Sequence, residues 1–250
     1  MKHMNTVLII VALLSINAAH ATLWYVHPDS VMNCVQHCLD SCSTGDTVLV
    51  GPGTYYENIN WPSMQDIDLV SENGSASTII DGGGIGRVIR IGIAVSQSTL
   101  IEGFTVQNGY DPSAGGGIDC AYGASPIIRG NFVINNVADS VGAGILCAYN
   151  SSPLIDSNTI MNNTSHYFAA GIGCWSNSHP TIQRNIVINN VADFNTGGIG
   201  CVSSSPQIIG NTITGNIGGE FFGGIGADDA SAPTVRDNTI TDNVAMWGAG

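Results

Sequence analysis

Short runs of alternating apolar and polar residues recur along the chain at a nearly constant interval. From residue 115 to residue 250 a Gly-Ile pair returns about every 27 residues, with its glycine at positions 117, 144, 171, 198 and 224. A proline keeps step at 126, 153, 180, 206 and 233, as do two asparagine columns, at 131, 158, 185, 211 and 238 and at 136, 163, 190, 216 and 243. This repetition predicts a solenoid in which each unit packs on its neighbours.

Each unit contains three runs in which every second residue is apolar. The first run contains Ile118 and Cys120, the second follows the proline with Ile128, and the third follows the first asparagine with Val133. A period of two is typical of a strand with one buried face. The pattern predicts an all-β fold, a parallel β-helix with three strands per rung and about 26 to 28 residues per rung, each strand lying ~4.8 Å from its copy.

The rungs before residue 115 are less regular. Residues 103–108 align with 131–136, and residues 79–82 and 88–91 belong to the rung before. Further upstream, Val35, Cys38, Leu39 and Cys42 have the spacing of one apolar helix face. We therefore expect a short N-terminal helix at about residues 31–43 that caps the coil, followed by a first strand at residues 45–50.

Several segments carry a family resemblance. Residues 45–55 (GDTVLVGPGTY), residues 79–82 (IIDG) and the repeated Gly-Gly-Ile, Ser-Pro and Asn motifs resemble the right-handed β-helix repeat proteins of the pectin-lyase-like superfamily. The resemblance covers nearly all of the chain after residue 21 and implies a right-handed coil. It does not imply one activity, because that superfamily contains lyases, hydrolases, esterases, epimerases and non-enzymatic surface proteins.

The first 21 residues have the features of a secretory signal peptide. Lys2 and His3 precede an apolar run at residues 7–16 that is shorter than the ~20 residues of a membrane helix, and residues 19–21 form an Ala-His-Ala cleavage site. We expect residues 22–250 to form a single parallel β-helix domain, with clear repeats at 115–250. We expect it outside the cytoplasm, in the periplasm, in the medium or at the cell surface, without membrane insertion.

Without the leader, the chain carries five arginines, no lysine and 19 acidic residues, a formal charge of −14. Such a surface repels phosphate backbones and acidic membranes, so the charge excludes nucleic acid as a partner. The apolar content of 44% is high enough for a buried core.

Four cysteines fall in one column, two residues after the isoleucine of each unit: Cys120, Cys147, Cys174 and Cys201. Their position in the alternating pattern points their side chains inward. The Cβ atoms of cysteines on neighbouring rungs would lie ~4.8 Å apart, which is more than the ~3.8 Å of a disulfide. We expect buried free thiols. One ligand per rung also disfavours a metal site. The remaining three, Cys34, Cys38 and Cys42, lie on the capping helix, and their redox state is left open.

The asparagine columns have two interpretations. Asn tolerates the left-handed backbone of a sharp bend, and its amide can bond to the copies above and below, which predicts buried ladders. The alternative is that these amides bind sugar or calcium. No specific calcium motif is present, and we predict no cofactor.

The resemblance places a sugar-binding cleft on the outer side of the first strand of each rung. Glycines at 173, 200 and 226 would leave its floor open to a ligand. The turn that enters the strand is rich in aromatic and acidic residues. The predicted ligand-binding residues are Tyr167, Phe168, Phe194, Phe221, Phe222, Trp247, Trp175, Asp193 and Glu220. Sugar faces stack on such rings; the alternative is that the rings pack over the turn.

Catalytic signals are weak. A lyase needs a base beside a neutralised uronate, whereas Arg129 and Arg236 fall on the second strand, away from the cleft. Asp228 and Asp229 occupy the place of the Asp-Asp pair of polygalacturonases, but the Gly-His-Gly motif of those enzymes is replaced by residues 248–250, Gly-Ala-Gly. Asp228, Asp229 and Asp119 are therefore only weak catalytic candidates.

These observations favour a secreted or cell-surface protein that binds a polysaccharide or surface glycan without catalysis. The alternatives are a polysaccharide-degrading lyase or glycoside hydrolase with part of its site beyond residue 250, and a structural spacer or adhesin segment. Residues 248–250 resemble the start of another rung. We therefore expect the native chain to continue and this chain to associate end to end through an uncapped last rung.

Overall fold

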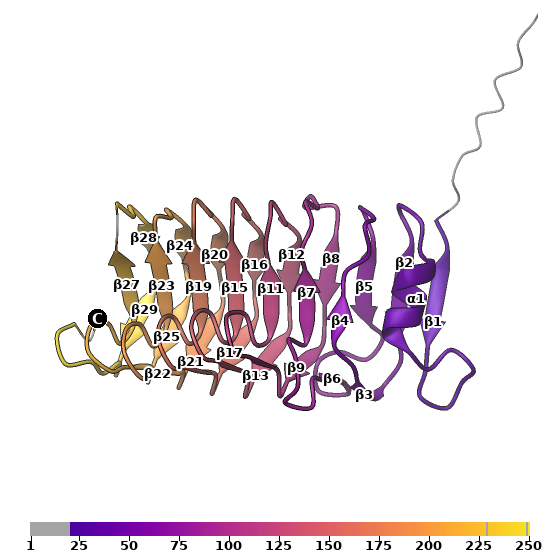
Figure 1. Cartoon of the computed structure of the whole chain (residues 1–250), viewed down its shortest axis with the longest axis horizontal. Helices are drawn as coiled ribbons and strands as arrows, with labels where there is room; N and C mark the ends of the chain where they lie inside the picture. The colour runs from indigo at the N-terminus through magenta and orange to yellow at the C-terminus, as the bar shows by residue number, and fades with distance from the viewer. Residues whose placement is uncertain (1–20, 229, 249) are drawn as a thin grey trace, which may run out of the picture.

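The computed structural model describes residues 21–228, 230–248 and 250. Its strands wind into one elongated parallel coil, with the N-terminal helix and strands at one end and the last repeats at the other (Figure 1). Every pair of neighbouring strands in its sheets is parallel and in register, one rung to the next, as in Ile118 opposite Ile145 and Cys120 opposite Cys147. The predicted parallel β-helix is confirmed. The predicted signal peptide, except for Ala21, lies outside the described residues.

Four sheets run along the coil. Sheet A contains β1 (Leu23–Val26), β2 (Thr47–Val50), β5 (Asp68–Ser71), β8 (Leu100–Glu102), β12 (Ile127–Arg129), β16 (Leu154–Asp156), β20 (Thr181–Gln183), β24 (Gln207–Ile209) and β28 (Thr234–Arg236). Sheet B contains β3 (Gly53–Tyr56), β6 (Thr78–Asp81), β9 (Thr105–Gln107), β13 (Phe132–Ile134), β17 (Thr159–Met161), β21 (Ile186–Ile188), β25 (Thr212–Thr214) and β29 (Thr239–Thr241). Sheet C contains β4 (Ile59–Asn60), β7 (Ile89–Ile91), β11 (Ile118–Cys120), β15 (Ile145–Ala148), β19 (Ile172–Trp175), β23 (Ile199–Val202) and β27 (Ile225–Asp228). Sheet D contains β10 (Tyr110–Asp111), β14 (Val137–Ala138), β18 (Thr164–Ser165), β22 (Val191–Ala192) and β26 (Ile217–Gly218).

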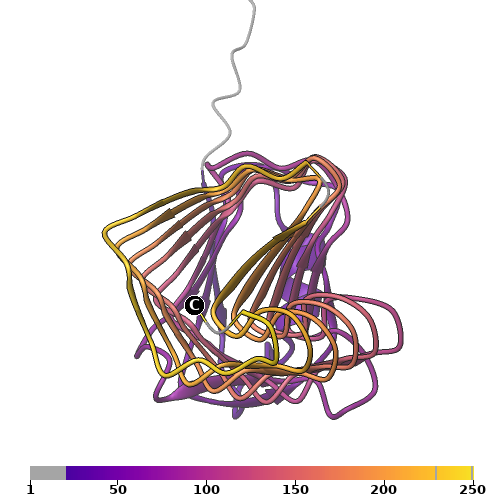
Figure 2. The same cartoon turned by 90° about the vertical axis from the view of Figure 1, so that its left-hand side faces the viewer.

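Sheet D is the difference from the predicted three strands per rung. Each of its strands has two residues, and from β14 onward each follows a residue of the second asparagine column, as in Val137–Ala138 after Asn136. A two-residue strand is too short to show a period of two in the sequence. Viewed along the axis, the connections from sheet D to sheet C protrude from the coil (Figure 2). These connections are called the wall loops below, and they contain residues 139–143, 166–170, 193–197 and 219–223.

The core is one continuous column of side chains inside the coil. Ile118, Ile128 and Val133 are fully buried, and so are their counterparts through most of the later rungs. Residues between them face outward, as the period of two predicts.

The two asparagine columns are buried ladders. Asn163 shows the pattern: its Nδ2 donates to the carbonyl of Val133 at 3.0 Å and to Oδ1 of Asn190 at 2.9 Å, while its Oδ1 accepts bonds from the backbone N–H and the side-chain amide of Asn136, both at 3.0 Å. The structural interpretation is confirmed. The left-handed backbone, however, belongs to the residue before each ladder position, such as Asn162 with φ 56°.

The N-terminal end differs from the prediction in two ways. The helix α1 (Val35–Ser41) is shorter than residues 31–43, and it starts where the carboxylate of Glu57 accepts bonds from the backbone N–H groups of Val35 and Gln36, both at 2.8 Å. In addition, β1 pairs with β2, so the first strand precedes the helix. The predicted apolar face is correct, because Val35, Cys38, Leu39 and Cys42 are buried.

All seven cysteines have free thiols, and the four in the repeat column are completely buried in sheet C. Burial raises the pKa of Cys120 and Cys147 well above the usual range. The column therefore serves as small apolar core residues rather than as nucleophiles.

Replacing Asn163 with Ala tests the ladders. The substitution leaves the Val133 carbonyl and the Asn136 N–H without buried partners, so we expect the free energy of unfolding to fall by about 3 kcal/mol or more, at ~1–3 kcal/mol per orphaned group. The matched control is Asn162→Gly, because Asn162 is exposed with positive φ and glycine occupies the equivalent position at Gly215. Urea denaturation of both variants measures the difference; equal stabilities would contradict the ladder.

The cysteine column gives a second prediction. Alkylation under denaturing, non-reducing conditions should label Cys120, Cys147, Cys174 and Cys201 in full, because none of them is bonded to another. Peptide mass spectrometry reads the labels, and a disulfide between any two of the four would refute the assignment.

Candidate functional site

The outer face of sheet C lies between the wall loops on one side and the turns toward sheet A on the other. We call this region the cleft. Three pockets follow one another along it, with volumes of about 190, 210 and 240 Å³. Their residues on sheet C are Asn60 and Arg90 in the first, Leu146, Ala148 and Trp175 in the second, and Trp175, Val202 and Asp228 in the third. Because the strands are ordered from β4 to β27, the pockets form a line along the coil axis.

Aromatic rings of the protein itself pack against the glycines on the cleft floor. A Cβ on Gly200 would lie 2.6 Å from Cζ of Phe168, and one on Gly226 would lie 2.5 Å from Cδ2 of Phe222. Phe168 is only 1% exposed and packs with Leu146 and Val202 in a second apolar cluster outside the main core. The wall loops therefore fold over these glycines, and the expectation that the glycines leave the floor open to a ligand is wrong there.

The aromatic residues of the wall loops form two layers. Phe168 belongs to the inner, packed layer, and its ring forms a T-shaped contact with that of Trp175, with centroids 5.8 Å apart. In the outer layer Tyr167 and Phe194 stack at 5.2 Å, and Phe221 continues the row edge-on at 5.4 Å from Phe194. The interpretation that the rings pack over the turn thus describes the inner layer. The rings of the outer layer form the row along the coil axis that a sugar-binding cleft requires.

The outer layer remains accessible. Tyr167 is 50% exposed, and Trp247, on the rung after that of Phe221, is 76% exposed. On the opposite side of the cleft, Tyr122 and Tyr149 stack with centroids 5.1 Å apart and are both exposed. The edges and the uncovered faces of these exposed rings, in rows on both sides of the cleft, can contact the apolar faces of a sugar chain.

A polar row accompanies the aromatic rings. Nδ1 of His166 lies 2.6 Å from a carboxylate oxygen of Asp193, and Nε2 lies 3.6 Å from one of Asp139. The hydrogen bond with Asp193 raises the pKa of the His166 imidazole. Glu220, on the next wall loop, donates its backbone N–H to the Phe194 carbonyl at 2.7 Å. Asp193 and Glu220 thus lie on neighbouring wall loops, where acids were predicted.

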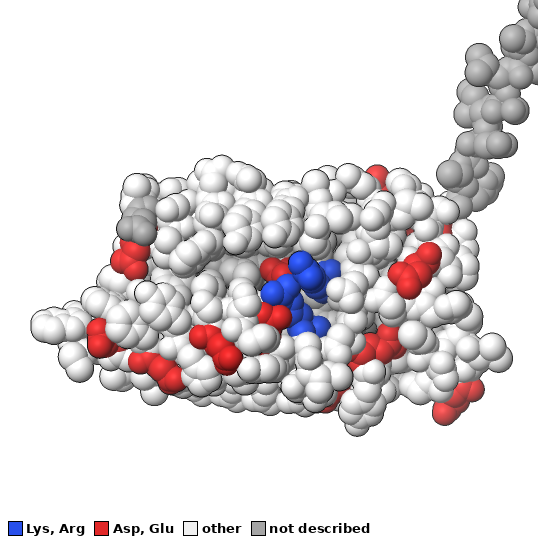
Figure 3. All heavy atoms as spheres, viewed as in Figure 1, with Lys and Arg blue, Asp and Glu red and all other residues white. Residues whose placement is uncertain are grey.

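A basic cluster at the first pocket was missed by the sequence reasoning. Arg87 forms ion pairs with Asp111 and Asp119, each at 3.0 Å, whereas Arg90 lies 3.9 Å from Asp119 with nearly half of its side chain exposed. Figure 3 shows these arginines as a single patch in the middle of the face that carries sheet C. Arg129 does lie on sheet A, as predicted, where it pairs with Glu102.

The sequence alignment of neighbouring rungs contained the information that predicts this cluster. Arg90 lies opposite Asp119 on the neighbouring strand, as aligning residues 88–91 with 117–120 would have shown. The argument against a lyase used Arg129 and Arg236, which lie on the second strand, away from the cleft. It does not apply to Arg90, because Arg90 lies on sheet C.

Asp119 is the catalytic candidate with the most unusual environment. Burial raises the pKa of its carboxyl to about 6, against the opposing effect of the Arg87 and Arg90 guanidinium groups. A carboxyl group that titrates near neutrality can exchange protons with a ligand. Its side chain is only 5% exposed beneath Arg87, so a ligand would reach it through the arginines.

The predicted Asp-Asp pair is only partly described. Asp228 accepts a hydrogen bond from the Asn195 amide at 3.1 Å at the far end of the cleft. Asp229 lies outside the described residues. Within those residues, no group of three or more His, Cys, Asp or Glu side chains is arranged to hold a metal ion. The same part of the chain contains no helix with the length and hydrophobicity to cross a membrane.

Comparison with known proteins adds information on the fold. The family model described as "Right handed beta helix region" matches residues 69–240, the segment that carries most of the cleft. No curated protein matches the sequence. The functional assignment therefore depends on the site itself.

The buried carboxyl gives a prediction on pH. Because the folded-state pKa of Asp119 lies above its ordinary value of 3.8, the folded protein holds this proton more tightly than the unfolded chain does. The contribution to stability is full below about pH 4 and is lost as the pH rises through about 6, by about 3 kcal/mol.

The matched variant is Asp119→Asn, which cannot ionise. Chemical denaturation between pH 3.5 and pH 7 should show wild-type stability falling relative to this variant. Carbon NMR of the Asp119 carboxyl should show a midpoint near pH 6. Parallel stability curves and a midpoint near pH 4 would contradict the assignment.

Proposed function

The chain belongs to the right-handed β-helix family, and within it we propose a secreted or cell-surface protein that binds a polysaccharide along the cleft without cleaving it. The observation that carries the proposal is the line of three pockets with aromatic rings on both sides. A linear polymer presents the same groups at regular intervals, and so does a cleft built from repeated rungs.

The dimensions of the cleft suit several sugar units of a chain. From β7 to β27 it crosses six strands, about 24 Å at ~4.8 Å per step. Trp175 lines both the second and third pockets, so a single polymer lying on its ring would occupy both. Grooves that combine aromatic surface with a few polar groups are typical of ligand sites.

The charges of the cleft give the bound chain a direction. Arg90 offers a half-exposed guanidinium at one end, and Asp228 offers a carboxylate at the other. Acidic substituents of the polymer are favoured near Arg90 and disfavoured near Asp228.

A polysaccharide-cleaving enzyme is the second candidate. Asp119 favours it, because a carboxyl group with a pKa of about 6 beside two arginines is the kind of acid or base that such reactions use. The limited access to its side chain favours binding over catalysis.

The test begins with a glycan array and continues with variants of the outer aromatic layer. Replacing Tyr167, Phe194 and Trp247 together with Ala should abolish binding to the polysaccharides found, because stacking surface is lost, and should leave the melting temperature nearly unchanged. Affinity electrophoresis and calorimetry provide the two readouts. Phe168→Ala should instead lower the melting temperature, because that ring is buried in the second cluster.

Phe132→Ala is the matched control, since Phe132 is an exposed ring on sheet B, away from the cleft. Binding that survives the triple variant would contradict the proposal. Release of shortened products from a bound polysaccharide, lost in Asp119→Asn, would replace it with the enzyme. An array without any binding would favour a structural spacer.

A further inference from the structure

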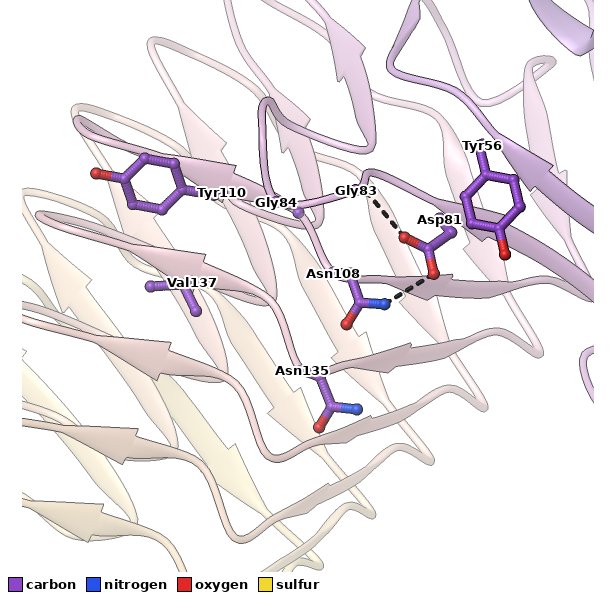
Figure 4. A pocket seen from close by; sticks show the side chains of 9 residues that line it. Tyr56, Asp81, Gly83, Gly84, Asn108, Tyr110, Asn135 and Val137 are labelled. Carbon is purple, nitrogen blue, oxygen red and sulfur yellow. Dashed lines mark hydrogen bonds between the residues drawn. The ribbon is translucent and has the colours of Figure 1, made fainter.

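A second groove lies outside the cleft, where sheet B meets sheet D. It holds about 640 Å³, within the range of small-ligand sites. The loop at residues 82–87 separates it from the first cleft pocket, because Gly83 and Gly84 line the groove whereas Gly86 and Arg87 line the pocket. Figure 4 shows Tyr56 at one end of the groove and Tyr110 at the other, with Asn108 and Asn135 between them. We call it the Tyr56 groove.

The two tyrosines provide ring surface at the ends of the groove. Tyr56 is 78% exposed, so most of its ring is in contact with solvent. Tyr110 is only partly exposed, and its hydroxyl donates to Asp139 at 2.9 Å, which fixes the orientation of its ring. Accessible tyrosine rings are suited to the apolar face of a sugar ring.

The space between the tyrosines is open and polar. A Cβ added at Gly83 or Gly84 would meet no atom within 4 Å. The side-chain amide of Asn135 is exposed, and within the described part of the chain only the backbone N–H of this residue forms a hydrogen bond, so the amide offers both a donor and an acceptor. Asn108 uses its Nδ2 to donate to Asp81 at 2.7 Å, which leaves its carbonyl oxygen to accept a hydroxyl.

The groove has a fixed negative charge. The Asp81 carboxylate accepts bonds from the Gly83 N–H at 2.9 Å, from Gln107 at 2.8 Å and from Asn108. Burial alone would raise the pKa of Asp81, but these three hydrogen bonds outweigh it and hold the pKa below its ordinary value. None of the nine lining residues is basic. An acidic sugar would therefore be repelled.

We propose that the Tyr56 groove is a second carbohydrate site, independent of the cleft, that binds a short neutral oligosaccharide between its two tyrosines. One sugar unit stacks on Tyr56, and the hydroxyl groups of the units beyond it bond to the amides of Asn108 and Asn135, since three strand steps separate Tyr56 from residue 134 in the register. Its preference is opposite to that of the Arg90 end of the cleft. One molecule with both sites can connect a neutral glycan to a second chain.

The experiment is an NMR titration of the folded protein with four hexasaccharides. The probes are cellohexaose, laminarihexaose and mannohexaose, which are neutral, and hexagalacturonate, which is acidic. The signals of Gly83, Gly84 and the Asn135 side chain report on the groove, and the Trp175 indole N–H reports on the cleft. At least one neutral probe should shift the groove signals, and hexagalacturonate should leave them in place.

Three variants separate the contributions. Tyr56→Ala should weaken binding at the groove about tenfold through lost stacking, whereas Tyr56→Phe should retain it. Asn135→Gly should also weaken binding, and it removes the amide without backbone strain, because Asn135 has φ 56° and Gly215 fills the same column. The response of Trp175 should be unchanged in all three.

Some results would overturn the proposal. They are groove signals that no neutral probe moves, groove signals that hexagalacturonate moves equally well, and an affinity that Tyr56→Ala leaves unchanged. Each of these can occur while Trp175 still responds to ligand, so failure of the groove is distinguishable from failure of the cleft.

Discussion

The hydrogen bonds that pass from one buried asparagine to the next fix the spacing of the rungs and align equivalent residues of neighbouring rungs. Each ladder amide connects the backbone of its own rung to those on both sides, as Asn163 does for Asn136, Asn190 and the Val133 carbonyl. Both columns lie at bends, where backbone groups have no partner within a regular strand. These bonds hold the bends on both sides of sheet B in place. The outward side chains of the strands between the bends can therefore differ from rung to rung without displacing the buried side chains.

This constraint explains why the features of the candidate site are on the turns and on outward positions. The wall loops enter sheet C just after the second ladder and sheet D, so they start from the same place on every rung. Side chains at equivalent loop positions therefore fall in rows, which is how Tyr167, Phe194 and Phe221 come to lie beside one another. Rows of this kind suit ligands that are themselves repetitive.

The sequence predicted the inside of the coil better than its outside. The period of two identified Ile118, Cys120 and Val133 as buried, because an alternating strand in a closed coil has only one inner face. It could not distinguish Tyr167 from its neighbour Phe168, since the direction of a side chain in a turn does not follow a period. It also missed Arg90, whose place beside Asp119 depends on the pairing of an irregular rung with a regular one.

The repetition also creates a hazard during folding. If a strand paired with the wrong repeat, one full unit away, asparagine would still lie opposite asparagine and isoleucine opposite isoleucine. The ladders alone therefore barely favour the correct pairing over this one. The cluster at Arg87 and Asp119 does discriminate. If β15 took the place of β11 beside β7, Leu146 would replace Asp119 and the two guanidinium groups would lose their shared carboxylate. The charged residues that distinguish this rung from the others thus also favour the correct order of the repeats in the coil.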